Sequence, residues 1–259
     1  MKKIGQSLKM KKILGTFGKG VRGSLSFNWS ASGGKNCDTN CRMHPDTKRA
    51  DKIAGTPCYA MRLEMVYAGV KRSLQSREDI PPWKLCGMAL VELQSLEARG
   101  VSIPWFRFSV DGSLPQPSDV RADKLFRGQI RALVSWLVER KIPVHLPVES
   151  YSKARFYRSI IGDLVCVRES AQTESRFVSA LGAVSVFVGE HLPRPQRVAE
   201  ARRVAKRRLA ATNRKQVVCP AITHGWAVRY GGMKKNDGAH CGNCIACADP
   251  LIDIIYPKH

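Results

Sequence analysis

The amino-acid sequence predicts an α/β protein built around a parallel β-sheet, and three observations lead to this expectation. Short apolar segments with strand character alternate with longer segments of helical spacing along most of the chain. Hydrophobic residues make up 44% of the 259 residues, which is enough for an ordinary core. No apolar run approaches the roughly 20 residues of a membrane-spanning helix. We therefore expect a complete or partial β/α (TIM-like) barrel, with an open doubly wound sheet as the alternative.

The expected strands are short runs rich in β-branched and aromatic residues, and turn-forming residues bound them. In chain order they are Ser24–Trp29, Trp105–Val110, Val144–Val148, Leu164–Val167, Val184–Val188 and Val217–Val218. Six such strands separated by helical segments are typical of βαβ units. No glycine-rich nucleotide motif follows any of them, so folds that bind a nucleotide cofactor lack support.

The expected helices lie between these strands and carry apolar residues at roughly helical spacing. Leu85, Met88 and Leu96 show this spacing in one segment, and Gly100 follows it, as glycine commonly follows the end of a helix. In chain order the expected helices are Tyr59–Val70, Trp83–Arg99, Arg121–Lys141, Ser152–Ile161, Thr173–Leu181 and Gln196–Ala211.

The chain is strongly basic, with 43 Lys and Arg against 21 Asp and Glu and a net charge of +22. Such a charge repels itself unless a polyanion neutralises it, and nucleic acid, either DNA or RNA, is the usual polyanion. A membrane is not an expected partner, because no amphipathic segment with an aromatic face is evident. The residues expected to bind nucleic acid are Lys11, Lys12, Arg202, Arg203, Lys206, Arg207, Arg208, Trp226, Arg229, Lys234 and Lys235.

We expect three regions in the chain. Residues 1–23 form a basic N-terminal arm, residues 24–218 form the barrel-like domain with a cysteine loop at 30–58, and residues 219–259 form a cysteine-rich metal-binding segment. The basic N-terminus lacks the apolar stretch of a secretory signal, so we expect a cytoplasmic protein. Nine cysteines in a reducing compartment favour metal binding over disulfides.

The strongest single motif lies near the C-terminus. Cys241, Cys244 and Cys247 follow one another at two-residue spacings, and the remote Cys219 precedes a proline. Such spacings let several thiolates reach one centre from a tight turn. We expect these four cysteines to hold a 4Fe-4S iron–sulfur cluster or a zinc ion, and the sequence leaves both open.

A second cysteine set follows the first expected strand. Cys37, Cys41 and Cys58 lie there in a loop with Gly and Asp residues, where a core thiol has little reason to be. We therefore expect a second metal site in this loop. Cys86 lies on a helical face and Cys166 lies within an apolar strand, so both are expected in the core.

Chemistry in parallel α/β sheets takes place just beyond the carboxyl ends of the strands. Acidic and polar residues follow three of the expected strands at this position. The expected catalytic residues are Asp111, Glu149 and Glu169, and the expected cofactor-binding residues are Ser113, Ser150 and Arg168. The structural alternative is that the aspartate caps a turn and that both glutamates pair with arginines.

Six segments stand out together: NWSASGGKNCDTNC, PCYA, WFRFSVDGSLP, VVCPA, CGNCIAC and IIYPKH. They resemble an uncharacterised family of phage- and plasmid-encoded cysteine-rich proteins. The resemblance spans about Phe27 to His259, and the cysteine motifs carry most of it. It implies an origin in a bacteriophage or another mobile element, and hence a place in the cytoplasm of a bacterial host cell.

Two better-known families are distantly similar. The loop after the first strand resembles that of radical S-adenosylmethionine enzymes, which implies a 4Fe-4S cluster at Cys37, Cys41 and Cys58 together with S-adenosylmethionine. Sixteen residues separate Cys41 from Cys58, which is a longer gap than those enzymes have. The barrel, the C-terminal cysteines and the basic surface are similar to tRNA-guanine transglycosylases and their phage relatives that insert 7-deazaguanine into DNA. That resemblance implies zinc and an aspartate nucleophile, for which Asp111 is the candidate.

The chain is therefore expected to be a metal-dependent enzyme that modifies nucleic acid, of iron–sulfur radical type, acting on a base of DNA or RNA. One alternative is a zinc-containing transferase that exchanges bases. The other is a non-catalytic regulator with a structural metal site, in which Trp226 and the basic residues around it would bind unpaired nucleotides by stacking. A chemical change in the bound nucleic acid would separate the enzymes from the regulator.

Overall fold

The computed structural model describes residues 14–16, 25–27, 75, 80–103, 105–108, 114–171, 173–180, 182–189, 192–219 and 246–257. An eight-stranded sheet forms its centre, with the strand order β1-β2-β3-β4-β5-β6-β8-β7. The strands are β1 (Leu14–Thr16), β2 (Leu25–Phe27), β3 (Phe106–Phe108), β4 (Val144–Val148), β5 (Cys166–Ala171), β6 (Val184–Val188), β7 (Lys215–Val218) and β8 (Ile252–Pro257).

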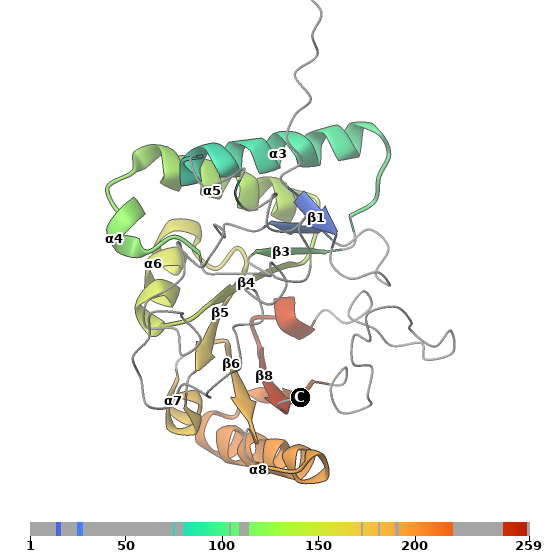
Figure 1. The fold of residues 1–259 in the computed structure, drawn as a ribbon, viewed down its shortest axis with the longest axis vertical. Coiled ribbons are helices and arrows are strands. Elements are labelled where there is room, and N and C mark those ends of the chain that lie inside the picture. Colours follow the sequence, from blue (N-terminus) through green and yellow to red (C-terminus); the bar gives the residue numbers. More distant parts are fainter. Residues whose placement is uncertain are drawn as a thin grey trace, which may run out of the picture.

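In the spatial order of the sheet, every neighbouring pair from β2 through β8 to β7 is parallel, whereas β1 pairs antiparallel with β2. Strands β2 to β6 lie side by side in chain order, and β8 is inserted between β6 and β7 (Figure 1). The described sheet ends at β1 on one edge and at β7 on the other, so it is open. The prediction of an α/β fold with a parallel sheet is confirmed, and the closed form of the expected barrel is wrong.

The helices gather on one face of the sheet. They are α3 (Pro82–Ala98), α4 (Pro117–Val120), α5 (Lys124–Glu139), α6 (Tyr151–Ile161), α7 (Glu174–Ser179) and α8 (Arg194–Thr212), followed by the 3-10 turn η2 (Ala246–Ala248). Figure 1 shows α3, α5, α6, α7 and α8 along the outer side of the curved sheet, with η2 on the other side. Among the described helices, none is long and apolar enough to cross a bilayer.

Alternate strand residues supply the core beneath these helices. Phe106, Leu146 and Val167 are buried under α3, α5 and α6, and Val186 and Ile255 are buried under α7 and α8. Leu146 is in register with Val167, and Val186 is in register with Ile255, so the apolar side chains continue along one face of the sheet. The intervening residues of each strand therefore point to the helix-free face.

Polar side chains cap the N-termini of helices α5 and α6. The carboxylate of Asp123 accepts a hydrogen bond from the backbone N–H of Phe126 at 2.9 Å, and the Ser150 hydroxyl accepts one from the N–H of Lys153 at 3.3 Å. Such caps satisfy N–H groups that have no partner within the helix.

The expected helix at 59–70 lies outside the described residues. Strands β4 and β6 have the expected bounds, and β5 extends from Cys166 to Ala171, beyond its expected end.

Strand β8 was not expected, and a buried ion pair holds it in the sheet. The Asp253 carboxylate, with no exposed surface, accepts hydrogen bonds from Arg208 at 2.9 Å, Arg214 at 3.1 Å and Gln216 at 3.1 Å. It also accepts the backbone N–H of Val184 in the neighbouring strand at 3.1 Å. Arg208 is itself fully buried, so its expected role in nucleic-acid binding is replaced by a structural one.

Candidate functional site

The helix-free face of the sheet is unusually polar. Arg107 of β3, His145 of β4, Cys166 and Arg168 of β5, and Tyr256 of β8 alternate with residues of the helix-covered core, which places them on this face. Their charges act on one another, because Arg107 and Arg168 both lower the pKa of His145. We refer to these five residues as the inner cluster.

Arg168 joins the inner cluster to the C-terminal cysteine segment. It is fully buried, and its guanidinium donates hydrogen bonds through Nε, Nη1 and Nη2. The acceptors are the carbonyl oxygens of Val184, Ala246, Cys247, Asp249 and Ile252, at 2.7–3.2 Å. Arg168 was expected to bind a cofactor. Its donors instead fasten η2 and the start of β8 to the sheet.

Two of the four predicted C-terminal metal ligands belong to the described residues. Cys247 lies in η2, and its Sγ is 3.2 Å from the hydroxyl of Tyr256. Cys219 directly follows β7, and its backbone N–H donates to the carbonyl of Ile255 at 2.8 Å. Burial is the main cause that raises the pKa of Tyr256, and the charges of Cys247 and Cys219 raise it further. Cys241 and Cys244 lie outside the described residues.

Tyr256 lies in an environment that keeps its hydroxyl protonated. Burial raises its pKa well above the usual range, and the charge of Cys247 and the hydrogen bond to that residue act in the same direction. The phenol therefore keeps its proton, and either the phenol or the Cys247 thiol can be the donor in the hydrogen bond that joins them. Its ring stacks on Phe187, with 4.9 Å between the ring centres. This contact fixes the orientation of the hydroxyl.

The donor set around η2 fits a soft metal centre. Cys219 and Cys247 are both half-buried. Thiolates of this kind are the ligands of zinc and of iron–sulfur clusters. Within the described ranges, no three His, Cys, Asp or Glu side chains form a metal-binding group. Cys37, Cys41 and Cys58, the expected second site, lie outside those ranges.

Cys166 and Cys86 are both buried, as expected for core thiols. Burial is the main cause that raises the pKa of each thiol, and so both stay protonated. Cys166 belongs to the inner cluster, and a charge on Cys247 raises its pKa further.

The predicted catalytic carboxylates that the structure describes are engaged in ion pairs. Glu149 accepts a hydrogen bond from Lys153 at 2.9 Å, and the Lys153 ammonium also donates to the carbonyl of Leu114. Glu169 accepts two hydrogen bonds from Arg176, both at 2.6 Å, and is buried on the helix-covered side. These contacts match the structural alternative, in which both glutamates pair with arginines, except that Glu149 pairs with a lysine.

The remaining strand-end residues are placed differently. Ser150 caps α6 through its hydroxyl, which also lies 3.1 Å from the hydroxyl of Ser152. Its hydrogen bonds are therefore those of a helix cap. Asp111 and Ser113 lie outside the described residues, and the catalytic role of Asp111 stays a prediction.

A basic surface runs along α8. Arg202, Arg203, Lys206 and Arg207 are exposed there, as the prediction of nucleic-acid binding requires. Glu174 pairs with Arg203 and Arg207, which partly neutralises that side. Arg202 and Lys206 lie one helical turn apart and have no ion-pair partner in the part of the chain that the structure describes. Lys11, Lys12, Trp226, Arg229, Lys234 and Lys235, also predicted to bind nucleic acid, lie outside the described residues.

Replacing Arg202 and Lys206 together by glutamine is expected to weaken binding to single-stranded nucleic acid. Loss of two phosphate contacts would reduce the slope of log K against log salt by about 1.4 for a single strand. Binding is measured by fluorescence anisotropy over a salt series. The matched control is Lys124→Gln with Arg127→Gln on α5, which removes the same charge from another exposed helix. An equal loss in both double variants would contradict a specific role of α8.

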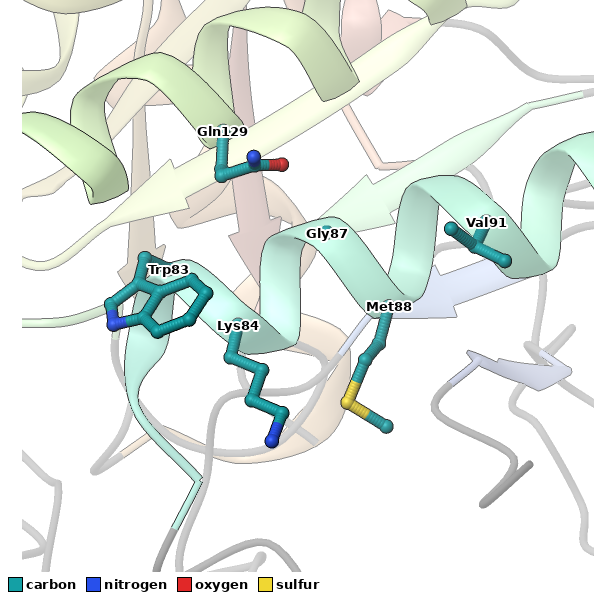
Figure 2. Close-up of a pocket in the computed structure, with 6 residues that line it drawn as sticks. All are labelled: Trp83, Lys84, Gly87, Met88, Val91 and Gln129. Carbon is teal, nitrogen blue, oxygen red and sulfur yellow. The ribbon is translucent and has the colours of Figure 1, made fainter. Parts of the chain in front are cut away.

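A shallow apolar groove lies on the helical side of the protein. Its volume is about 240 Å³, and it is lined by Trp83, Lys84, Gly87, Met88, Val91 and Gln129. Figure 2 shows that five of these residues follow one another along α3, with Gln129 contributed by α5. Because α3 covers the face opposite the inner cluster, this groove is separate from the cysteines.

Arg107, His145 and Tyr256 were missed by the sequence analysis. The sequence signal that could have found them is their position, because each polar side chain alternates with buried apolar residues within a strand. Comparisons with family models, with curated proteins and with solved structures found no match. The chemistry of the helix-free face is therefore the basis for assigning a function.

Proposed function

We propose that the protein is an iron–sulfur enzyme of radical type that modifies a base of DNA or RNA. The observation that carries the proposal is the position of Cys219 and Cys247, the two described cysteines of the C-terminal set, relative to the sheet. Cys219 follows the carboxyl end of β7, and the chain also leaves β2 at that edge toward Cys37, Cys41 and Cys58, because β2 and β7 belong to one parallel series. Ligands of parallel α/β sheets bind at this edge.

The form of the sheet supports the same proposal. Strands β2 to β6 follow one another in chain order, with their helices on one face, as in a partial β/α barrel. A cysteine loop directly after the first parallel strand is the arrangement that radical S-adenosylmethionine enzymes use. The C-terminal four cysteines would then hold an auxiliary cluster, with Cys247 beside the inner cluster of polar residues.

Each part of the chain has a stated task in this proposal. Cys219, Cys241, Cys244 and Cys247 hold one cluster, and Cys37, Cys41 and Cys58 hold a second that S-adenosylmethionine can reach. A reduced cluster supplies the single electron that radical chemistry needs. Arg168 keeps η2 in place, the Tyr256 hydroxyl shares a hydrogen bond with the Cys247 sulfur, and the exposed basic side chains of α8 hold phosphates. Asp111 remains a candidate catalytic residue.

A non-catalytic nucleic-acid-binding protein with a structural metal site is the second candidate. The observation that favours it is that Glu149 and Glu169 are both committed to ion pairs. The same observation weakens zinc-dependent base exchange, which needs a second carboxylate beside its aspartate nucleophile.

Protein purified without oxygen is expected to contain about four or eight irons with matching sulfide and to absorb near 400 nm. Cys247→Ser removes a ligand sulfur and is expected to lose about half or more of this iron. Cys86→Ala is the matched control, since it removes a buried thiol from α3, and it is expected to keep the iron. Iron and sulfide analysis of the three proteins makes the comparison.

The nucleic acid is then examined by mass spectrometry after incubation with the reduced protein and S-adenosylmethionine. A mass change in a base, absent when S-adenosylmethionine is left out, is expected. One bound zinc without iron would sink the radical proposal. Iron without any change in the nucleic acid would favour the non-catalytic candidate.

A further inference from the structure

Phe187 is the most exposed aromatic side chain among the residues that the structure describes. It is 60% exposed, whereas Val186 and Val188 on either side of it in β6 are buried. Val186 belongs to the core under α7 and α8, and strand residues alternate between faces, so the Phe187 ring lies on the helix-free face. Strand β6 is an interior strand between β5 and β8, where a ring of this size is normally buried. Its exposure therefore needs an explanation.

Tyr256 covers one face of the Phe187 ring. The two residues are in register on the neighbouring strands β6 and β8, which lie side by side in Figure 1. Their ring centres are 4.9 Å apart and the ring planes are inclined by 25°, which is a stacked arrangement. The surface of Phe187 that remains exposed therefore belongs to the opposite face and the edge of the ring. A second flat ring can extend the stack on that side.

The stacked pair lies beside the two described cysteines of the C-terminal set. The Tyr256 hydroxyl is 3.2 Å from Sγ of Cys247. Cys219 follows β7, the strand on the other side of β8, and its backbone N–H donates to the carbonyl of Ile255. At the carboxyl edge of the strands, Tyr256 thus stands between Phe187 and the cysteines. A ring stacked on Phe187 would lie at the edge where parallel α/β sheets bind their ligands.

A nucleobase is the ring that suits this position. Exposed aromatic side chains bind unpaired bases by stacking, and they do so with any base because every base has a flat π-face. Bases within a duplex are already stacked on their neighbours, so only an unpaired base offers a free face. The net charge of +22 favours a base that belongs to a polyanion over a free nucleoside.

We propose that Phe187 is the platform on which an unpaired base of single-stranded DNA or RNA stacks, next to the cysteine segment. The inference deepens the proposed function and rests on it for nucleic acid as the partner. It adds the form of the substrate, a strand with at least one unpaired base, and the side chain that holds this base. It does not depend on which metal the cysteines bind.

The test uses the full chain and a single-stranded oligonucleotide that carries one 2-aminopurine, a fluorescent base that stacking quenches. The wild-type protein is expected to bind the oligonucleotide and to quench its fluorescence. Phe187→Leu keeps an apolar side chain but removes the ring, so it is expected to weaken binding about tenfold and to lose most of the quenching. Phe187→Trp keeps a ring and is expected to bind and quench as the wild type does.

The matched control is Leu125→Ala, which removes a large apolar side chain that is 59% exposed on α5. It is expected to bind as the wild type does, and thermal melts followed by circular dichroism check that every variant is folded. Equal binding and quenching by wild type and Phe187→Leu would overturn the platform and leave the proposed function in place. Displacement of the oligonucleotide by free adenosine would assign the ring to a small molecule and overturn it too. No oligonucleotide binding by the wild type would remove nucleic acid as the partner as well.

Discussion

The Asp253→Asn variant is expected to lose about 3–5 kcal/mol of its free energy of unfolding. The asparagine keeps the shape of the side chain but removes its charge. Arg208, which has no exposed surface, then keeps a buried positive charge without its partner. Arg214 loses its ion pair with the same carboxylate. Breaking one side of a buried pair is costly because the remaining charge stays out of water.

Urea or guanidinium unfolding followed by circular dichroism measures this loss. Asp119→Asn, at an exposed position of α4, makes the same chemical change and is expected to stay within about 0.5 kcal/mol of the wild type. Adding Arg208→Met to Asp253→Asn removes the stranded charge and is expected to recover part of the stability. A loss below about 1 kcal/mol in Asp253→Asn would contradict the role of this pair in the core.

The second large effect is expected for Arg168→Met, with a loss of more than about 3 kcal/mol. Methionine fills similar space but leaves five carbonyl oxygens without their donor. Three of these carbonyls belong to residues 246–249, so the cysteine segment should detach from the sheet before the strands separate. Limited proteolysis is expected to cut near η2 in the variant under conditions that leave the wild type intact.

The matched controls for this position are Arg168→Lys and Arg155→Met. Lysine keeps the charge but has no planar fork, so it is expected to satisfy only part of the set and to recover part of the stability. Arg155 is exposed on α6, and its replacement by methionine is expected to change stability by less than about 0.5 kcal/mol. An Arg168→Met protein that unfolds at the wild-type denaturant concentration would contradict the anchoring role.

Most of the described fold was predictable from local sequence. The bounds of β4 and β6 matched because each is a mostly apolar run with valine at both ends. Pro143 and Glu149 flank β4, and Gly189 follows β6. The far end of β5 was not predictable, since Arg168 and Glu169 are charged. Those residues are tolerated in a strand only because partners from α7 and from residues 246–252 meet them.

Strand β8 shows why other parts of the fold could not be predicted from the local sequence. Asp253 is the second residue of the run IDIIYP, where a carboxylate argues against a buried strand. Its partner Arg208 comes from α8, more than 40 residues earlier in the chain. No local pattern reports such a pairing. The candidate site shows the same difference between local and long-range information. Cys219 was correctly expected at the end of a strand, because a local pattern predicts that strand. The anchoring role of Arg168 was not predictable, because its carbonyl acceptors lie about 80 residues away in the chain.

The place of β8 between β6 and β7 has a consequence for synthesis on the ribosome. Strands β6 and β7 emerge first, and they cannot pair with each other in the native way, because the strand that separates them has not yet been made. Each presents an open edge to other nascent chains during that interval. Residues 219–251 join β7 to β8 and emerge before β8 docks, so the sheet is completed only when this last strand has been made.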